Sequence, residues 1–173
     1  MIFLTGMTGV GKSEVGARLA VRLGLSFVDL DAKVSRATGR KIPQIFAEEG
    51  EAAFREQEAL ALRRVIRTPH AVIALGAGAL DRQTSFELVH SSGVLVYLRA
   101  PINVLASRLF SGLHGRPMLA GAETVEHLEH RLLDMLSHRE PRYLTAQIIV
   151  DLDEQTSIED TVDRLCQVLK SLP

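Results

Sequence analysis

Short hydrophobic runs rich in β-branched residues alternate along the chain with longer stretches of helical periodicity. Each run is bounded by Gly, Pro or charged residues, a pattern typical of buried parallel strands: Ile2–Thr5, Phe27–Leu30, Ala71–Leu75, Val94–Leu98 and Gln147–Val150. Apolar positions recur at helical spacing over residues 12–24, 32–39, 51–67, 81–90, 101–111, 123–139 and 157–171. This alternation predicts an α/β fold, an open five-stranded parallel sheet between two helical layers.

Two segments do not follow the alternation. Residues 39–50 are predicted to form a loop or a short helix between two longer helices. Residues 111–122 contain three Gly, one Pro and Arg116, and show no periodicity. Irregular segments of this length in a small domain are usually functional loops, so we expect 111–122 to form a lid. No linker or repeat interrupts the rest, and residues 1–173 are therefore predicted to form one domain.

The charge balance bears on the partners of the protein. The chain has 20 Lys and Arg against 21 Asp and Glu, a net charge of −1, so no overall field attracts nucleic acid or anionic membranes. The chain opens without a basic segment, and its apolar runs are far shorter than the roughly 18 residues of a spanning helix. We therefore expect a cytoplasmic protein. A compact domain with few aromatic residues is also expected to be a monomer. The single Cys166 occupies an apolar helical position and is predicted to be buried.

Residues 6–13, GMTGVGKS, place Gly6, Gly11, Lys12 and Ser13 at the spacing of a phosphate-binding loop. Glycines let the backbone wrap around phosphate oxygens, Lys12 can reach the β- and γ-phosphates, and the Ser13 hydroxyl can ligate Mg²⁺. The loop follows the first strand and opens a helix, whose dipole favours anions. The motif predicts binding of a nucleoside triphosphate, and the chain length favours a small-molecule kinase or a compact NTPase.

Two carboxylates stand at the carboxyl end of the second predicted strand, Asp29 and Asp31 in FVDLD. Residues two apart on a strand point to the same side, and ligands of such sheets bind beyond the carboxyl ends of the strands. We interpret one carboxylate as assisting Mg²⁺ through water and the other as holding or deprotonating an acceptor hydroxyl. The alternative for Asp31 is that it caps the helix beginning near Ala32.

Other candidates are weaker when each is taken alone. Arg55 lies on a predicted helix on which acidic neighbours could simply pair with it: Glu51, Glu56 and Glu58. Arg116 and Arg139 would ordinarily be surface charges, and Gly76–Gly78 would be only a turn. Their order after a phosphate-binding loop is what makes them candidates for binding a second substrate.

Seven ordered segments resemble the shikimate kinase family over essentially the whole chain: GMTGVGKS, FVDLD, IFAEEGEAAFRE, LGAGA, VLVYL, RPMLAG and the R-x-x-x-Y pair Arg139/Tyr143. The resemblance implies a fold of the nucleoside-monophosphate-kinase type with strand order 2-3-1-4-5. It also implies transfer of the γ-phosphoryl group of ATP to the 3-hydroxyl of shikimate, with Mg²⁺ as cofactor. The shikimate-binding segment would span about residues 32–62.

The resemblance also implies roles for individual residues. The ATP-binding residues would be Gly6, Thr8, Gly9, Val10, Gly11, Lys12, Ser13, Glu14, Arg108 and Arg116. The shikimate-binding residues would be Asp31, Arg55, Gly76, Ala77, Gly78 and Arg139. Ser13 would ligate Mg²⁺ directly and Asp29 through water. Lys12, Asp31 and Arg116 would carry the catalysis, Asp31 as candidate general base and Arg116 as the arginine of the lid.

The chain departs from the family pattern at two positions. Ala77 replaces the middle residue of a Gly-Gly-Gly turn, and Thr145 replaces a glutamate two residues after Tyr143. If position 77 needs a positive φ, alanine costs about 1 kcal/mol or more, whereas a turn that needs only backbone donors accepts it. Both departures bear on the acceptor pocket. Two alternatives therefore stand: a kinase for another sugar acid such as gluconate, and a ligand-binding module without catalysis.

Overall fold

The computed structural model describes residues 1–110, 117–119 and 121–171, and these form a layered structure around one five-stranded sheet. The strands are β1 (Ile2–Thr5), β2 (Ser26–Asp29), β3 (Ala71–Ala74), β4 (Val94–Arg99) and β5 (Ile148–Asp151). All neighbouring strands are parallel and their order is β2-β3-β1-β4-β5, which confirms the predicted class and strand order.

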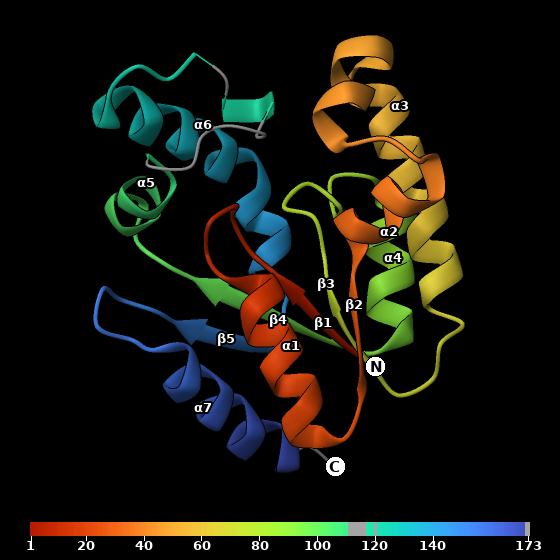
Figure 1. Cartoon of the computed structure of the whole chain (residues 1–173). Coiled ribbons are helices and arrows are strands. Elements are labelled where there is room, and N and C mark those ends of the chain that lie inside the picture. The colour runs from red at the N-terminus through yellow and green to blue at the C-terminus, as the bar shows by residue number, and fades with distance from the viewer. Residues whose placement is uncertain (111–116, 120, 172–173) are drawn as a thin grey trace.

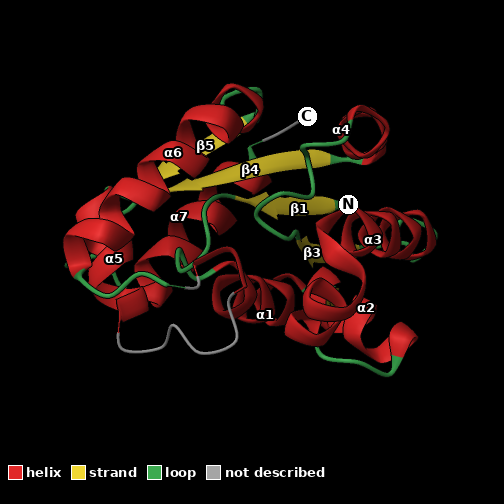
Figure 2. Cartoon of the chain, turned by 90° about the horizontal axis from the view of Figure 1, so that it is seen from above, coloured by secondary structure: helices red, strands yellow, loops and turns green. Residues whose placement is uncertain are grey.

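Seven α-helices are present in the described residues and cover both faces of the sheet (Figure 1). They are α1 (Lys12–Leu23), α2 (Leu30–Thr38), α3 (Ile42–Val65), α4 (Gln83–Ser92), α5 (Ile102–Phe110), α6 (Val125–Tyr143) and α7 (Ile158–Lys170). Helices α1 and α7 lie on one face, and α4 and α6 lie on the other (Figure 2). Figure 1 shows α2 with α3, and α5 with α6, projecting on either side beyond the carboxyl ends of the strands.

The hydrophobic core lies on both faces of the central strands. Every residue of β1 and β3 is buried, as continuous apolar runs predict for strands between two helical layers. The edge strand β5 instead alternates buried and exposed positions, and Ile149 is therefore partly exposed. Cys166 of α7 is buried, as predicted. No helix among the described residues is both long and apolar enough to cross a bilayer.

The junction of β2 and α2 differs from the prediction. Helix α2 begins at Leu30 rather than near Ala32, and its N-cap is Asp29, whose Oδ1 accepts the Ala32 N–H at 3.0 Å. The capping alternative for Asp31 is therefore wrong. A side-chain oxygen on the residue just before a helix satisfies an amide that has no helical partner, and Asp29 holds that position. Asp31 falls in the first turn of α2, where its side chain lines the cavities described below.

Residues 42–49, within the segment predicted as a loop or short helix, are helical and form the first part of α3. The two helical pieces meet at Gly50, where φ is 81° and ψ is 176°, values that only glycine adopts easily. Across this kink the rings of Phe46 and Phe54 pack with their centroids 4.9 Å apart. This contact packs the two helical pieces against each other across the kink.

Helix α6 continues four residues beyond its predicted end at 139, through Pro141 to Tyr143. Contacts with other elements outweigh the local preference here, because Tyr143 is buried and the Arg142 guanidinium donates to the Leu80 carbonyl. In the predicted lid, Pro117–Leu119 form a short 3-10 helix. The remainder of that prediction, including Arg116, falls largely outside the described residues.

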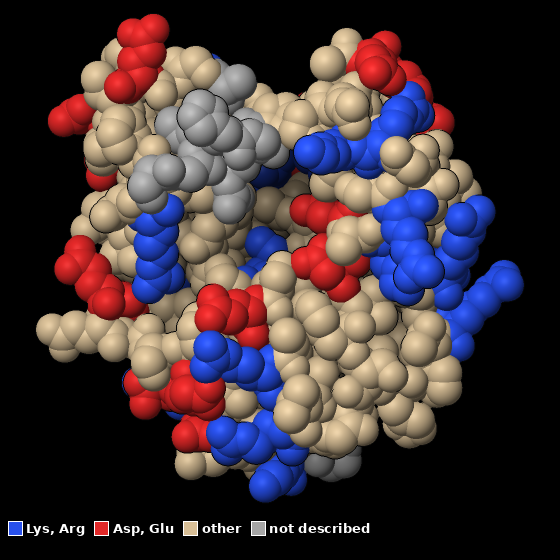
Figure 3. All heavy atoms as spheres, viewed as in Figure 1, with Lys and Arg blue, Asp and Glu red and all other residues tan. Residues whose placement is uncertain are grey.

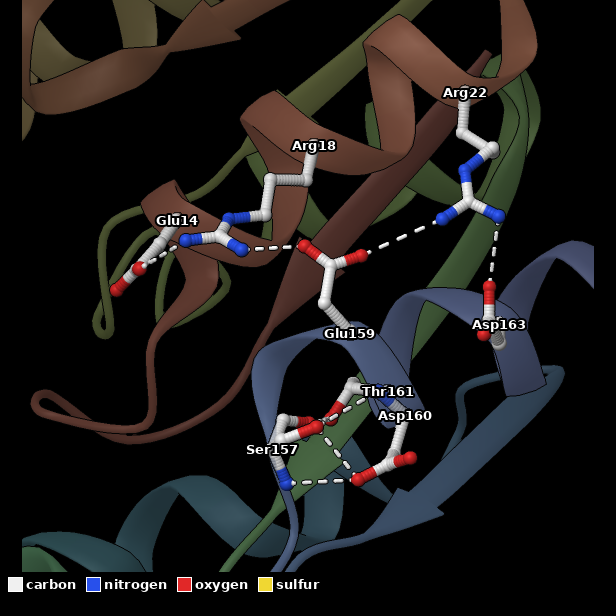
Figure 4. Close-up of polar contacts among 8 residues, drawn as sticks. All are labelled: Glu14, Arg18, Arg22, Ser157, Glu159, Asp160, Thr161 and Asp163. Atoms are coloured by element: carbon white, nitrogen blue, oxygen red, sulfur yellow. Dashed lines mark hydrogen bonds and ion pairs between the residues drawn. The ribbon is translucent and has the colours of Figure 1, made fainter.

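Helices α1 and α7 are joined by surface ion pairs and by buried side chains, and the buried side chains should dominate stability. Glu159 lies between Arg18 and Arg22, and Arg22 also pairs with Asp163 at 2.8 Å (Figure 4). These groups are about half exposed, and such pairs contribute little. Leu165, in contrast, is fully buried on α7.

We expect Leu165→Ala to lower the free energy of unfolding by about 2–5 kcal/mol, because it leaves a cavity in the core. Arg18→Ala should change it little. Urea unfolding followed by circular dichroism measures both variants. A loss in Arg18→Ala equal to that in Leu165→Ala would show that the ion pairs, rather than the core, hold α7 in place.

Candidate active site

The phosphate-binding loop connects β1 to α1 and carries its lysine folded back onto its own backbone. Gly9 and Gly11 have φ of +82° and +96°, so the tight path depends on residues without a Cβ. Gly11 is the N-cap of α1. The Lys12 ammonium donates to the carbonyls of Gly6 and Met7, at 2.7 and 3.0 Å. Positive charge is thus concentrated at the N-terminus of a helix, which suits an anionic ligand.

A cavity of about 320 Å³ lies against this loop. Its described lining consists of loop residues, the end of β2 and the segment after β3: Thr8, Gly9, Gly11, Lys12, Ser13, Glu14, Asp29, Asp31, Ala74, Leu75, Gly76 and Ala77. Three of the predicted ATP-binding residues are not part of this described lining: Gly6, Val10 and Arg108. Val10 is buried in the core, and Arg108 of α5 donates to the Asp153 carbonyl at 3.4 Å.

Ser13 and Asp29, the two predicted Mg²⁺ residues, are in direct contact in this cavity. The Ser13 hydroxyl donates to Asp29 Oδ2 at 2.5 Å, while the other oxygen of Asp29 caps α2. The carboxylate is therefore held at both oxygens and has little freedom to turn away. A hydroxyl and a carboxylate at the mouth of a phosphate loop are hard oxygen donors of the kind that Mg²⁺ binds, and these residues fit the ion.

A second cavity, of about 350 Å³, lies between the projecting helices. Its described lining mixes apolar with charged side chains: Thr8, Asp31, Ile42, Phe46, Phe54, Arg55, Glu58, Gly76, Ala77, Gly78, Pro117, Met118, Leu119, Met135 and Arg139. Figure 3 shows the molecule hollowed at this place, with acidic and basic side chains beside the hollow. An apolar wall with a few fixed charges is typical of a site for a small polar molecule.

The two cavities adjoin. Among the described residues, Thr8, Asp31, Gly76 and Ala77 line both of them. The Asp31 carboxylate and the Gly76–Ala77 backbone thus stand at the junction, with the phosphate loop on one side and the charged cavity on the other. A group bound in one cavity can therefore reach a group bound in the other.

Arg55 satisfies both interpretations that the sequence leaves open. Its Nη1 donates to Glu58 at 2.9 Å, and its Nη2 donates to Glu51 at 3.0 Å, so it does pair with its own helix, although not with Glu56. Its side chain is nevertheless almost buried and lines the second cavity. The ion pairs fix the direction of the guanidinium rather than remove it from the cavity.

Glu58 belongs to the site and was not among the predicted site residues. It is only 3% exposed, and its Oε1 has no hydrogen-bond partner among the described residues. Burial raises the pKa of Glu58 to about 7, against the opposing charge of Arg55, and the nearby Asp31 carboxylate adds to the increase. The feature of the sequence that could have identified Glu58 was its position three residues after Arg55, on the same face of a helix.

Gly76 and Gly78 leave room for these side chains. A Cβ on Gly76 would lie 2.2 Å from Glu58 Oε1, and a Cβ on Gly78 would lie 2.3 Å from Arg55 Nη2. Neither glycine nor Ala77 has a positive φ. The turn therefore needs space at its first and third positions and no unusual backbone angle at its second, which explains why alanine is accepted at 77.

Thr145, the other departure from the family pattern, lies outside the charged cavity. Its hydroxyl donates to the Arg142 carbonyl at 2.7 Å and lies 2.9 Å from Nε2 of His90. The residue is exposed and is not part of the described lining. Of the two departures, only Ala77 therefore bears on the site.

Arg139 of α6 is 6% exposed and faces the same cavity as Arg55. Its Nε donates to Asp81 Oδ2 at 3.1 Å, and no spacing rule predicts this contact because the two residues lie 58 positions apart. A guanidinium held at Nε can present its two terminal nitrogens side by side to a carboxylate. The arrangement suits phosphoryl transfer from a nucleotide to a hydroxyl of an anionic acceptor.

Known proteins support this interpretation. The sequence model of the shikimate kinase family matches residues 8–170. A shikimate kinase of Chlorobium chlorochromatii (strain CaD3) is 43% identical over 174 residues, covering 98% of this chain and 90% of the relative. One of Chlorobium phaeobacteroides (strain BS1) is 42% identical, covering 98% of this chain and 86% of the relative.

Solved structures agree with the sequence relatives. Shikimate kinase from Acinetobacter baumannii in complex with shikimate has a TM-score of 0.91 and 34% identity, covering 98% of this chain and 92% of that chain. Shikimate kinase from Bacteroides thetaiotaomicron has a TM-score of 0.89 and 34% identity, covering 98% of this chain and 97% of that chain.

The raised pKa of Glu58 predicts a pH dependence of stability. The unfolded chain releases this proton near pH 4.5 and the folded protein near pH 7. The folded state therefore binds the proton more tightly than the unfolded chain does. The stability that this proton contributes falls as the pH rises between these values. Glu58→Gln has no such proton to lose. The free energy of unfolding of this variant, relative to that of wild type, should therefore increase by up to about 3 kcal/mol as the pH rises across that interval.

Urea unfolding of both proteins at several pH values measures this difference. Glu56→Gln, on an exposed position of the same helix, is the matched control and should show no such trend. A difference between Glu58→Gln and wild type that stays constant with pH would contradict the raised pKa.

Proposed function

The chain belongs to the shikimate kinase family, and we propose that it transfers the γ-phosphoryl group of ATP to the 3-hydroxyl of shikimate, giving shikimate 3-phosphate and ADP. The observation that carries the proposal is the junction of the two cavities at Asp31. One cavity contains the phosphate loop, and the other contains two nearly buried arginines suited to a carboxylate. Shikimate offers both a carboxylate and ring hydroxyls.

On the nucleotide side, the chain supplies position and positive charge. Phosphoryl transfer needs little covalent chemistry from a protein, because the developing charge on the phosphate oxygens is met by fixed cations and backbone donors. Lys12 and the N-terminus of α1 provide this charge. Ser13, and Asp29 through water, would hold Mg²⁺, which supplies further positive charge to the β- and γ-phosphates when bound. Arg116 remains our prediction for the arginine of a lid.

On the acceptor side, Arg55 and Arg139 would bind the shikimate carboxylate and so fix the ring in the cavity. Asp31 would accept a hydrogen bond from the 3-hydroxyl and take its proton as the new phosphorus–oxygen bond forms. The apolar side chains of Phe46, Phe54 and Met135 line the same space. Their surface limits the water that could compete with the acceptor for the phosphoryl group.

We further propose that the protein acts as a cytoplasmic monomer on these small molecules, without nucleic-acid or membrane partners. The balanced charge of the chain, −1 in total, supports the proposal for nucleic acid and for anionic membranes. Sedimentation or light scattering at micromolar concentration would measure the oligomeric state.

The function is tested by coupling ADP release to product detection with MgATP and shikimate, gluconate or no acceptor. We expect ADP and a phosphorylated product with shikimate alone. Lys12→Ala should keep the fold and lose roughly 100-fold or more in rate, because a cation at the developing charge is removed. Arg36→Ala, on the exposed face of α2, is the control and should keep wild-type activity.

Other results would select the alternatives. Phosphorylation of gluconate, or ADP release without acceptor, would contradict the proposed substrate while leaving the phosphate loop intact. No turnover by folded protein that binds ATP would indicate a ligand-binding module.

Arg139→Ala should raise the KM for shikimate about tenfold or more, since a charge-assisted hydrogen bond contributes about 1.5–3 kcal/mol. The KM for ATP should stay nearly unchanged, because Arg139 does not line the nucleotide cavity. Initial rates with each substrate varied in turn separate the two constants. Equal increases in both would contradict the role assigned to Arg139.

A further inference from the structure

Tyr143, the last residue of α6, lies where three parts of the active site meet. Its side chain is fully buried. The phenol donates a hydrogen bond to the carbonyl of Ala77, and its oxygen is 4.0 Å from the sulfur of Met7. The ring packs against Tyr97 of β4, with 5.1 Å between the ring centroids. One side chain thus contacts the acceptor turn, the phosphate loop and the sheet.

The contact with Ala77 involves the middle peptide of the turn after β3. The carbonyls of Gly76 and Gly78 accept backbone N–H groups of Ala79 and Asp81, each at 3.0 Å. The Ala77 carbonyl instead accepts a hydrogen bond from the hydroxyl of Tyr143, which lies 66 positions away. Ala77 lines both cavities, so the direction of the peptide between them depends on a hydroxyl from α6.

The contact with Met7 reaches the loop that carries Lys12. The Met7 carbonyl accepts the Lys12 ammonium at 3.0 Å, and the Met7 side chain is buried against the phenol. A single oxygen therefore lies between the loop segment that anchors the lysine and the turn that lines the acceptor cavity. A displacement of one segment against the other requires the phenol to move or its contacts to break.

The surroundings of Tyr143 keep the phenol fixed and neutral. Arg139 stands four residues earlier, on the same face of α6, so the helix presents the acceptor arginine and the phenol together. Burial raises the pKa of Tyr143 well above its usual range, against the opposing charge of Arg139, so the hydroxyl remains a hydrogen-bond donor at neutral pH.

We propose that Tyr143 is a positioning residue that sets the separation between the acceptor turn and the phosphate loop. The proposal rests on the proposed function. Each substrate keeps its own contacts without the phenol, since Lys12 and Arg139 are unchanged. The acceptor hydroxyl and the γ-phosphate, however, would no longer be held at reacting distance, and transfer rates are sensitive to displacements of about 1 Å.

Tyr143→Phe removes the hydroxyl and keeps the ring. We expect kcat to fall about tenfold or more, with each KM changed by less than about threefold, because positioning is lost while binding contacts remain. A larger fraction of the released ADP should come from ATP hydrolysis that yields no shikimate 3-phosphate. Tyr97→Phe is the matched control, because it removes a hydroxyl from the other ring of the same pair. The Tyr97 hydroxyl interacts with Glu140. Its kcat should stay within about twofold of wild type.

A second readout does not need activity. Hydrogen exchange followed by mass spectrometry should show faster exchange of the turn amides of Leu75, Ala79 and Asp81 in Tyr143→Phe than in Tyr97→Phe, without substrates. Unchanged exchange, or equal kcat losses in the two variants, would overturn the proposal. If wild type does not phosphorylate shikimate, the proposed function fails, and the exchange comparison decides the role of Tyr143 by itself.

Discussion

The parallel pairing of β1 with β3 determines where the chemistry of this protein takes place. Leu4 lies opposite Ala74, and Leu75, the first residue after β3, donates its N–H to the Leu4 carbonyl at 3.0 Å. The phosphate loop after β1 and the acceptor turn after β3 therefore leave the sheet side by side. Because β2 pairs with β3 on its other side, Asp29 and Asp31 reach the same edge. The common wall of the two cavities follows from this register.

Local patterns were sufficient for much of the fold and for the nucleotide side of the site. A short apolar strand followed by a glycine-rich loop and a helix is encoded within about 20 residues, and Lys12 and Ser13 are placed by that segment alone. The boundaries of the neighbouring elements depend on more distant contacts. Phe46 packs on Phe54 across the kink at Gly50 in α3, and α6 continues through Pro141 to the buried Tyr143.

The acceptor side was predicted only in part, since its geometry comes from contacts between distant segments. Asp29 both caps α2 and contacts Ser13, whereas the sequence offered the helix cap as an alternative role for Asp31. Asp81 meets Arg139 across 58 residues, and no spacing rule connects them. The glycines at 76 and 78 could be interpreted only with Glu58 and Arg55 in place, because their role is to leave room for those side chains.

The charged groups of the acceptor cavity are costly to the fold and useful to the proposed reaction. A buried guanidinium without a partner would be strongly destabilising, and here each has a carboxylate: Glu58 for Arg55 and Asp81 for Arg139. The partners hold each arginine in one direction before any acceptor arrives, which lowers the entropy lost on binding. The cost is evident at Glu58, because desolvation of its buried carboxylate raises its pKa to about 7. A more stable, apolar cavity of the same volume could be built at this position, but it would have no means of orienting a carboxylate.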